Sequence, residues 1–492
     1  MLLSRRHFLA STTAALSAAA LPRFTRAAET ADASPIRLIV DSRVLDVRGK
    51  PATVFGMIQP NGTHGLIAQA GQRFQATVEN HLAEPMLIHW HGQTPPNAQD
   101  GVPGISQEPI AAGASYAYDY PLRSGTHWMH SHHGLQEQRL MAAPMIVRED
   151  ANTDVQEVVM LLHDFSFTDP AEQLSKLTGM TPMDHATMHH GGQIPANSGM
   201  DETAMHQMHM QMMQSGGGMA GMAMSHPNDV DYDAYLTNDR TLDDPEITRV
   251  EAGGRVRLRI INGATTTAFF IELPGLSGQV VAVDGNVVAP VAGNSFPIGM
   301  GQRLDIVVTL PRQEGAWPIL ARREGDANQT GIILATRKAA IGKIDSLAKS
   351  KAGIVSLELE RKLSALSPLP SRPADRRLLL SLEGGMMGYK WTLNGAAFGA
   401  NAPLPVSQGQ RVELTFMNHS DMMHPMHLHG HHYQVVAIGA QSFAGARRDT
   451  VMVPSMTSVT VAFDADNPGE WVLHCHNLFH MAAGMMTTVK YV

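Results

Sequence analysis

The chain has 492 residues, 43% of them hydrophobic, so we expect about three domains with substantial cores. A formal net charge of −8 provides no basic surface of the kind that binds nucleic acid, which excludes a nucleic-acid partner. A single cysteine rules out an internal disulfide, whereas 25 histidines and 31 methionines supply many side chains of the types that bind copper.

The N-terminus predicts an export signal over residues 1–28. The twin-arginine pair Arg5-Arg6 precedes an apolar run, 9–21, and small residues end the segment. This run is too short to span a bilayer, and no other stretch is apolar enough to do so. We therefore expect a removable bacterial signal and a mature protein in the periplasm.

The rest of the chain repeats one pattern three times. Each copy alternates apolar and polar residues and ends in asparagine; the copies are 71–80, 254–262 and 409–418. Alternation with a period of two predicts a strand that is buried on one face. Many short strands with glycine and proline turns predict an all-β protein of three two-sheet Greek-key sandwiches. The expected domains are 35–150, 155–338 and 352–492, with 339–351 as a linker.

One segment, 178–229, departs from this pattern. It contains twelve methionines and six histidines, while Ile194 alone represents leucine, isoleucine, valine and phenylalanine. A segment of this composition cannot form a core. It is either a flexible linker or, because thioethers are soft ligands that favour Cu(I), a segment that gathers copper. The sequence leaves both interpretations open.

Four His-x-His pairs occur at matching places in the first and third copies. They are His89/His91, His130/His132, His427/His429 and His474/His476. The matching positions of the middle copy are Ile271, Leu273, Leu320 and Arg322. Eight imidazoles suit three metals, with three ligands for each of two and two ligands for the third. The pairs predict a cluster between the end domains, but imidazole alone does not distinguish copper from zinc, iron or nickel.

Cys475 identifies the metal. On a strand its side chain faces the opposite way from His474 and His476, so one segment holds two metal sites back to back. A thiolate, two imidazoles and a methionine are the ligands of a blue-copper electron-transfer centre. The expected partners of Cys475 are His424, His480 and the weak axial ligand Met485.

These residues lie in segments that resemble the four copper motifs of the multicopper oxidase family, over essentially the whole mature chain. The segments are His89-Trp90-His91-Gly92, His130-Ser131-His132, His424-Pro425-Met426-His427-Leu428-His429 and 473–485. The Met-rich segment and the twin-arginine pair are most similar to the bacterial copper-resistance branch, which includes cuprous oxidases and laccase-like enzymes. The resemblance implies three cupredoxin domains and four coppers per chain.

The resemblance also implies how the ligands are shared. The type 1 copper takes His424, Cys475, His480 and Met485, and the type 2 copper takes His89 and His427. One type 3 copper takes His91, His130 and His476, and the other takes His132, His429 and His474. Enzymes of this family accept single electrons at the type 1 copper, pass them through the cysteine, and reduce O2 to water at the three remaining coppers. Cys475 is therefore expected to be catalytic.

Several acids are candidates for proton transfer. Asp100 stands where the family has an acid near the cluster, and we expect it to relay protons or to hydrogen-bond a ligating water. The alternative is an aspartate that caps a turn with Gly101. Family members often carry a second acid after the equivalent of His480, where this chain has Met481, so the proton route on that side stays open. Asp449 is either a buried acid beside the cluster or a surface residue at a strand edge.

The substrate prediction depends on the residues just before His424. Asp421, Met422 and Met423 place a carboxylate and two thioethers where Cu(I) would lie within electron-transfer reach; the methionines equally suit shielding of the copper or core packing. We expect a monomeric cuprous oxidase that confers copper resistance and oxidises phenols more slowly. The alternatives are a laccase for phenols or aromatic amines and a non-catalytic periplasmic copper-binding protein. A copper nitrite reductase would be expected to lack the full set of four pairs.

Overall fold

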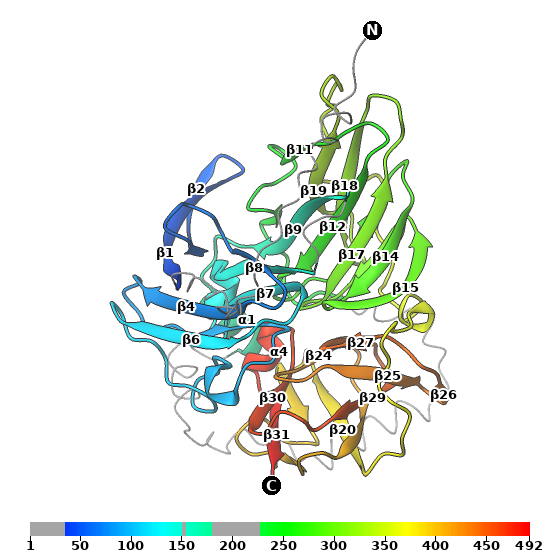
Figure 1. The fold of residues 1–492 in the computed structure, drawn as a ribbon. Helices are drawn as coiled ribbons and strands as arrows, with labels where there is room; N and C mark the ends of the chain where they lie inside the picture. Colours follow the sequence, from blue (N-terminus) through cyan, green and yellow to red (C-terminus); the bar gives the residue numbers. More distant parts are fainter. Residues whose placement is uncertain (1–34, 150–153, 180–226) are drawn as a thin grey trace, which may run out of the picture. The chain divides into compact units, whose positions relative to one another are not determined.

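The computed structural model of the protein describes residues 35–149, 154–179 and 227–492. The predicted export signal, 1–28, and most of the predicted Met-rich segment, 180–226, lie outside the described residues. Strands dominate the described chain and form six sheets, which pack in pairs (Figure 1). Each pair encloses a hydrophobic core of its own, so the predicted all-β fold of three two-sheet sandwiches is confirmed.

The first sandwich is built from residues 36–148. One sheet has the order β2-β1-β4-β6, with β1 (Ile36–Val47), β2 (Lys50–Ile58), β4 (Arg73–Asn80) and β6 (Ser115–Pro121). The other has the order β3-β8-β7-β5, with β3 (Leu66–Gln69), β5 (Ile88–His89), β7 (Gly125–Ser131) and β8 (Ala142–Arg148). Two short 3-10 helices lie between strands, η1 (Asn97–Gln99) and η2 (Gln136–Arg139).

The middle sandwich follows. Its larger sheet has the order β10-β9-β12-β17-β14-β15, with β9 (Gln156–Phe165), β10 (Ala234–Thr237), β12 (Arg255–Asn262), β14 (Gly278–Val283), β15 (Asn286–Gly293) and β17 (Arg303–Thr309). Its second sheet has the order β11-β19-β18-β13-β16, with β11 (Ile247–Arg249), β13 (Phe269–Glu272), β16 (Ser295–Ile298), β18 (Ala316–Arg323) and β19 (Gln329–Ala335). Helix α1 (Pro170–Thr178) follows β9.

The third sandwich begins after residues 339–375, which contain the 3-10 helix η3 (Glu360–Lys362). One sheet has the order β21-β20-β23-β29-β25-β26, with β27 also on β25; its strands are β20 (Arg376–Gly385), β21 (Lys390–Leu393), β23 (Arg411–Asn418), β25 (Tyr433–Ile438), β26 (Gln441–Ser442), β27 (Arg447–Arg448) and β29 (Ser458–Asp464). The other has the order β22-β31-β30-β24-β28, with β22 (Leu404–Val406), β24 (His424–Leu428), β28 (Thr450–Val453), β30 (Glu470–Cys475) and β31 (Met486–Tyr491). Helix α4 (Leu478–Ala482) follows β30.

The asparagine that ends each repeat has the same structural role three times. The three predicted repeat strands are β4, β12 and β23, and each ends in a buried asparagine. In each, Nδ2 donates to two backbone carbonyls: Glu84 and Ile110 for Asn80, Thr267 and Ile298 for Asn262, and Met422 and Val453 for Asn418. Buried carbonyls need such partners, so the asparagine fixes the loop that follows it. Residues counted from it therefore reach equivalent places.

In each copy, the two segments that hold the matching positions form neighbouring antiparallel strands. In the first sandwich His89 pairs with His130, and in the third His427 pairs with His474. In the middle sandwich Ile271 pairs with Ala321. The residue that matches His130 and His474 along the chain is its neighbour, Leu320. The middle copy thus differs from the others in register as well as in its side chains. Within the described residues, no helix combines the length and apolarity needed to cross a bilayer.

Candidate copper centres

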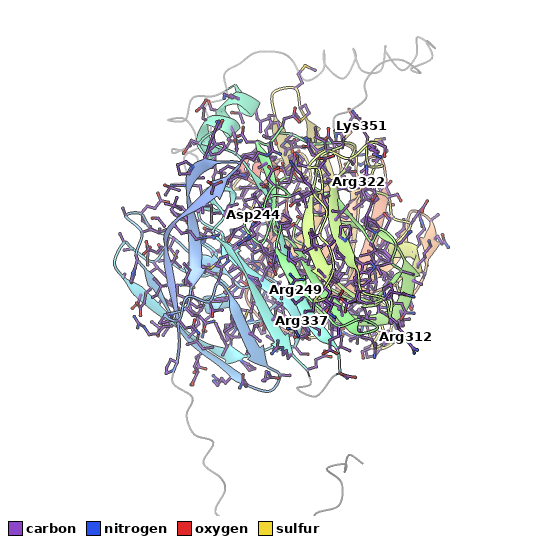
Figure 2. The ribbon with its side chains drawn as sticks, turned by 90° about the horizontal axis from the view of Figure 1, so that it is seen from above. Asp244, Arg249, Arg312, Arg322, Arg337 and Lys351 are labelled. Carbon is purple, nitrogen blue, oxygen red and sulfur yellow. The ribbon has the colours of Figure 1, made fainter. Side chains whose placement is uncertain are left out.

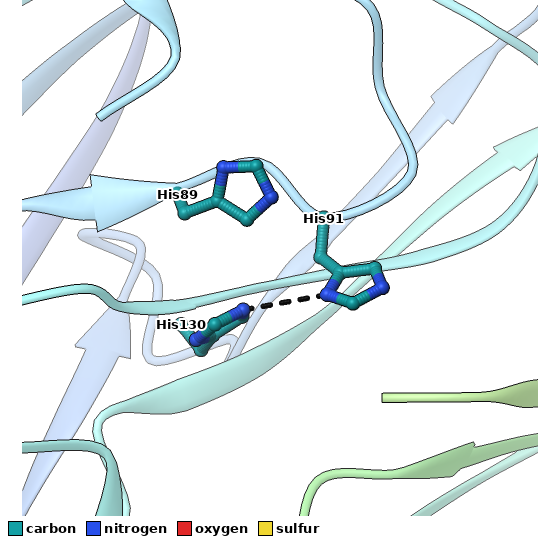
Figure 3. Close-up of side chains that lie close together, drawn as sticks. All are labelled: His89, His91 and His130. Atoms are coloured by element: carbon teal, nitrogen blue, oxygen red, sulfur yellow. Dashed lines mark hydrogen bonds between the residues drawn. The ribbon is translucent and has the colours of Figure 1, made fainter. Parts of the chain in front are cut away.

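The eight histidines of the four pairs are all buried, and strands of the first and third sandwiches bring them together. His91 Nδ1 lies 3.4 Å from His130 Nε2 and 3.2 Å from His476 Nε2. Figure 3 shows the first part of this arrangement, with His91 in the loop after β5 directed toward His130 on β7. Three ring nitrogens from two sandwiches therefore face one another.

The remaining five histidines lie close to these three and to one another. The nitrogens of His132, His429 and His474 all lie within 4.8 Å of one another, and His429 Nε2 is 3.1 Å from His474 Nε2. His89 Nε2 is 3.4 Å from His427 Nε2. The same nitrogens also group in other ways, since those of His89, His91 and His130 and those of His89, His427 and His429 likewise lie within 4.8 Å of one another.

A separate group surrounds Cys475 inside the third sandwich. The Cys475 Sγ lies 3.6 Å from His424 Nδ1 and 3.7 Å from His480 Nδ1, and the two nitrogens are 3.1 Å apart. Met485 is fully buried in the same core, and its carbonyl accepts a hydrogen bond from Cys475 N at 3.0 Å. His474, the residue before Cys475 on β30, belongs to the histidine cluster instead, so the two faces of this strand contribute to different groups, as its alternation requires.

The electrostatics of these groups suit a metal. Burial, followed by neighbouring imidazoles, lowers the pKa of His427 and His429 well below the ordinary value, and that of His132 to about 3. Neutral imidazole is the form that binds metal. Burial raises the pKa of the Cys475 thiol, so a metal ion must displace its proton. Buried neutral imidazoles with one thiol form a donor set that fits copper.

Asp100 contacts two histidines of the cluster. His429 Nδ1 donates to Asp100 Oδ2 at 2.8 Å, and His89 Nδ1 donates to the Asp100 backbone carbonyl at 2.9 Å. The carboxylate is buried. Gly101 follows with φ +82°, and a Cβ there would lie 1.8 Å from the carbonyl oxygen of Ile88, so only glycine fits. The side chain of Asp100 therefore contacts an imidazole of the cluster.

Asp449 is buried beside the cluster, which excludes the surface role that the sequence left open. His91 Nε2 donates to its Oδ1 at 3.1 Å, and Arg303 of the middle sandwich donates to both carboxylate oxygens, at 2.7 Å and 2.5 Å. Burial by itself raises the pKa of the Asp449 carboxyl, but the Arg303 guanidinium outweighs it and holds this pKa below its usual value. Asp449 is therefore an ionised acceptor for a histidine of the cluster.

Sequence reasoning missed Asp229, which contacts the Cys475 group. Its side chain is 0% exposed, and His480 Nε2 lies 3.2 Å from its Oδ1. Asn477 Nδ2 donates to its other oxygen at 2.5 Å. Burial by itself raises the pKa of this carboxyl, but His480 and the hydrogen bonds to it outweigh burial and lower the pKa. Asp229 falls at the end of the segment interpreted as an insertion, and no pattern in the sequence singles it out.

Sequence reasoning also missed Glu137, in η2. His130 Nδ1 lies 2.9 Å from Glu137 Oε2, and burial raises the pKa of this carboxyl well above its usual value. Glu137 and Met481 line one narrow gap together with His130, His132, His474 and His476. A buried acid thus lines the same gap as Met481, which stands where family members often have an acid.

The predicted substrate residues differ in exposure. Asp421 is exposed and Met423 is partly buried, whereas Met422 is 6% exposed and packs in the core of the third sandwich. The described residues on both sides of 180–226 also contact this sandwich: Leu174 of α1 packs in its core, and Asp229 contacts His480. The chain therefore enters and leaves the Met-rich segment against the sandwich that holds Cys475.

The molecule has three cupredoxin-like sandwiches and a buried histidine cluster between the outer two. A cysteine-centred site is joined to that cluster through one strand. Together these features define a copper-dependent oxidase. Family models described as multicopper oxidase match residues 51–152, 158–340 and 371–492. The chain belongs to the multicopper oxidase family, and it is an oxidoreductase that uses oxygen.

Individual relatives agree with this membership. The multicopper oxidase MmcO of Mycobacterium tuberculosis is 32% identical, over 86% of this chain and 80% of that protein. A copper resistance protein A homolog of Pseudomonas syringae pv. tomato is 26% identical, over 85% of this chain and 86% of that protein. The crystal structure of a laccase from Botrytis aclada shares the fold, with a TM-score of 0.69 and 23% identity over 92% of this chain and 87% of that one.

Proposed function

We propose that this multicopper oxidase oxidises Cu(I) to Cu(II) and passes the electrons to O2, which is reduced to water, and that it thereby protects the bacterial periplasm from copper. The observation that carries the proposal is the position of Cys475. Its sulfur faces His424 and His480, while the residues on either side of it, His474 and His476, reach the histidine cluster. A site that accepts electrons and a site that can reduce O2 are thus joined by one strand.

We assign the ligands of four coppers to the groups described above. The type 1 set is His424, Cys475, His480 and Met485; the type 2 pair is His89 and His427; the type 3 sets are His91, His130, His476 and His132, His429, His474. When bound, copper supplies the one-electron chemistry and the site of O2 reduction. The protein supplies buried neutral donors in fixed positions, and the backbone between Cys475 and its two neighbours provides a covalent route for electrons.

Two carboxylates serve this reaction in different places. Asp100 holds His429 by a hydrogen bond and lies close enough to His89 to pass protons toward the cluster. Asp229 accepts a hydrogen bond from His480 on the side of that ring away from Cys475. Asp229 therefore places a negative charge next to the site that would receive the electrons, which favours a cationic reductant such as Cu(I).

The entry site for Cu(I) is proposed at Asp421, Met422 and Met423, immediately before His424. An exposed carboxylate attracts the ion, and thioethers are ligands that prefer Cu(I). Because Met422 is buried in the core of the third sandwich, we propose that Met423 makes the contact at the surface. The similarity to a copper resistance protein A homolog supports copper as the substrate, whereas similarity to laccases keeps phenols as the competing class.

The test is O2 uptake by one fully loaded preparation with Cu(I) and with a phenol. We expect faster uptake with Cu(I), an intense blue thiolate absorption and four coppers per chain. In a variant carrying Asp421→Ala, Met422→Leu and Met423→Leu, Cu(I) oxidation should slow while phenol oxidation persists; leucine keeps the volume of each methionine and removes its sulfur. Unchanged Cu(I) turnover in this variant would reject the entry site. Faster phenol turnover in the wild type would favour a laccase.

The remaining proposals concern organisation and location. We propose domains at 35–150, 155–338 and 352–492, and the ranges of the matching family models support these three divisions. We also propose that the protein is a monomer. We also propose export by the twin-arginine signal in 1–28. Replacing Arg5 and Arg6 by lysine should keep the protein in the cytoplasm, as cell fractionation would show, and continued export would reject the signal.

A further inference from the structure

The middle sandwich carries none of the four histidine pairs, yet it contacts the cluster. We propose that Arg303 and Gly301 of this sandwich set one of the three metal positions, the one that faces His91, His130 and His476. The inference rests on the proposed assignment of these three histidines to one copper. Arg303 acts as a positioning residue, since it reaches the metal position through another side chain.

The first contact is an ion pair between sandwiches. Arg303 is the first residue of β17, and its Nη1 and Nη2 donate to Oδ1 and Oδ2 of Asp449, at 2.7 Å and 2.5 Å. Both side chains are at most 1% exposed. The planar fork of arginine matches a carboxylate with two bonds, which fixes the orientation of the carboxylate as well as its distance.

The second contact passes this orientation to the cluster. His91 Nε2 donates to Asp449 Oδ1 at 3.1 Å, which places the ring proton on Nε2 and leaves the lone pair of Nδ1 free. Nδ1 is the atom that lies 3.4 Å from His130 Nε2 and 3.2 Å from His476 Nε2. Arg303 therefore determines, through Asp449, which nitrogen of His91 faces the metal position and where that nitrogen lies.

Arg303 is itself held in place on every side. Its backbone N donates to Asp284 Oδ1 at 2.9 Å, Nη1 also donates to the Gly301 carbonyl at 2.9 Å, and Nε donates to the Thr126 carbonyl at 3.1 Å. The lysine ammonium cannot reproduce this planar set of donors. Arg303 differs in this respect from Arg249, Arg312 and Arg337, which are exposed on the surface of the middle sandwich (Figure 2).

The same turn contacts a second histidine of this position. Gly301 has φ +76°, and a Cβ there would lie 2.7 Å from Cδ2 and 2.9 Å from Cγ of His476. The backbone at Gly301 thus packs directly on the His476 ring. Two residues apart in sequence, Gly301 and Arg303 constrain His476 and His91, which come from different sandwiches.

Other contacts hold the histidines of the other two metal positions. His429 donates to the Asp100 carboxylate, and His427 Nδ1 donates to the backbone carbonyl of Asp449 at 2.9 Å, while the Asp449 carboxylate oxygen Oδ1 lies farther away, at 3.6 Å. A displaced Asp449 carboxylate leaves that backbone bond in place. Loss of Arg303 is therefore expected to affect one metal position selectively.

The test uses Arg303→Lys, Arg303→Met and Gly301→Ala in the full-length, copper-loaded protein. The matched control is Arg259→Lys on β12, because Arg259 is equally buried in the middle sandwich and pairs with Asp305 at 3.1 Å. Anomalous diffraction at the copper edge gives the occupancy of each position, and dialysis against a chelator followed by metal analysis gives retention. The blue thiolate absorption reports on the Cys475 site in the same samples.

We expect copper retention at the position facing His91, His130 and His476 to fall about tenfold in the Arg303 variants, with the blue absorption and the control unchanged. Gly301→Ala, a smaller change, carries the test if Arg303→Met does not fold. Full occupancy in Arg303→Lys and Gly301→Ala, or equal loss at every position, overturns the inference alone. A wild type without copper at this position overturns the ligand assignment and the inference together.

Discussion

The carboxylate of Asp229 lies 3.2 Å from Nε2 of His480, and the chain separates these residues by 251 positions. His480 Nδ1 faces the sulfur of Cys475 at 3.7 Å, so a single imidazole connects a buried acid to the proposed type 1 site. The hydrogen bond places negative charge next to the ring, and a negative charge stabilises the more positive oxidation state of a metal.

Asp229→Asn should therefore raise the potential of the type 1 site. The neutral amide keeps the size of the side chain and removes its charge, and we expect a rise of about 60 mV, a tenfold change for a one-electron couple. Redox titration of the blue absorption measures it. The matched control is Asp231→Asn, because the Asp231 side chain is 86% exposed and pairs with Arg323 instead. A potential that falls or stays constant in Asp229→Asn would contradict the role of this charge.

Met485→Leu should also raise this potential, by a different route. The thioether is proposed as a weak axial ligand, and leucine fills nearly the same volume without a donor atom. Met485 is fully buried, and the similar volume of leucine leaves the shape of the core nearly unchanged. An unaltered redox titration would show that the Met485 sulfur does not bind the metal.

Asp100→Asn should weaken the cluster while leaving the blue absorption intact. His429 loses its anionic acceptor, and changes to residues that hydrogen-bond metal ligands typically lower metal affinity or activity by about 10- to 100-fold. Copper analysis and O2 uptake measure the two effects separately. Asp119→Asn is the control, since the Asp119 side chain is 48% exposed and pairs with Arg73 on the surface. Full copper content and full turnover in Asp100→Asn would exclude the proposed role.

Asn262→Ala should destabilise the protein without removing ligands. The substitution leaves the buried carbonyls of Thr267 and Ile298 without these donors, at a cost of about 2–4 kcal/mol for the pair. Denaturant unfolding measures the change, and copper content per folded chain should stay constant. Asn294→Ala, at an exposed position of the same sandwich, should change stability by less than about 0.5 kcal/mol. Equal effects of the two substitutions would disprove the structural role of the asparagine.

The buried carboxyl group of Glu324 should make the free energy of unfolding fall as the pH rises. Burial raises the pKa of its carboxyl from 4.5 to about 7, against a hydrogen bond from Val355 N. A folded-state pKa above the unfolded value means that the contribution is complete below about pH 4.5 and is lost as the pH approaches 7. The loss is at most about 3 kcal/mol. Unfolding of the copper-free Glu324→Gln variant at pH 4.5 and 7.5 should lack this part of the pH dependence; an identical dependence in both proteins would contradict it.

Counting residues along the chain was sufficient to predict that the histidine pairs occupy equivalent places, because strand geometry is periodic. Each repeat strand ends in an asparagine that fixes the next loop, so His89 and His427 fall at equal distances from Asn80 and Asn418 and reach equivalent places. The count was one residue out in the middle copy, where Ile271 pairs with Ala321. There no shared metal site requires the two strands to keep the same register.

The burial of a side chain was harder to predict from the sequence than its position along a strand. Met422 and Asp421 are neighbours in sequence, yet one packs in a core and the other is exposed. Asp449 had two interpretations that the local sequence did not separate. The structure separates them because an aspartate is stable in a core only with partners, and its partner Arg303 comes from another sandwich.

The amino-acid sequence by itself determined the family, the all-β fold and the donor groups, since these depend on residue types at short, regular spacings. Only the tertiary structure decided which charges support those donors. Asp229 and His480 are 251 residues apart, and Arg303 and Asp449 are 146 apart. Such pairs form where sandwiches meet, and no local periodicity records which side chains face each other there.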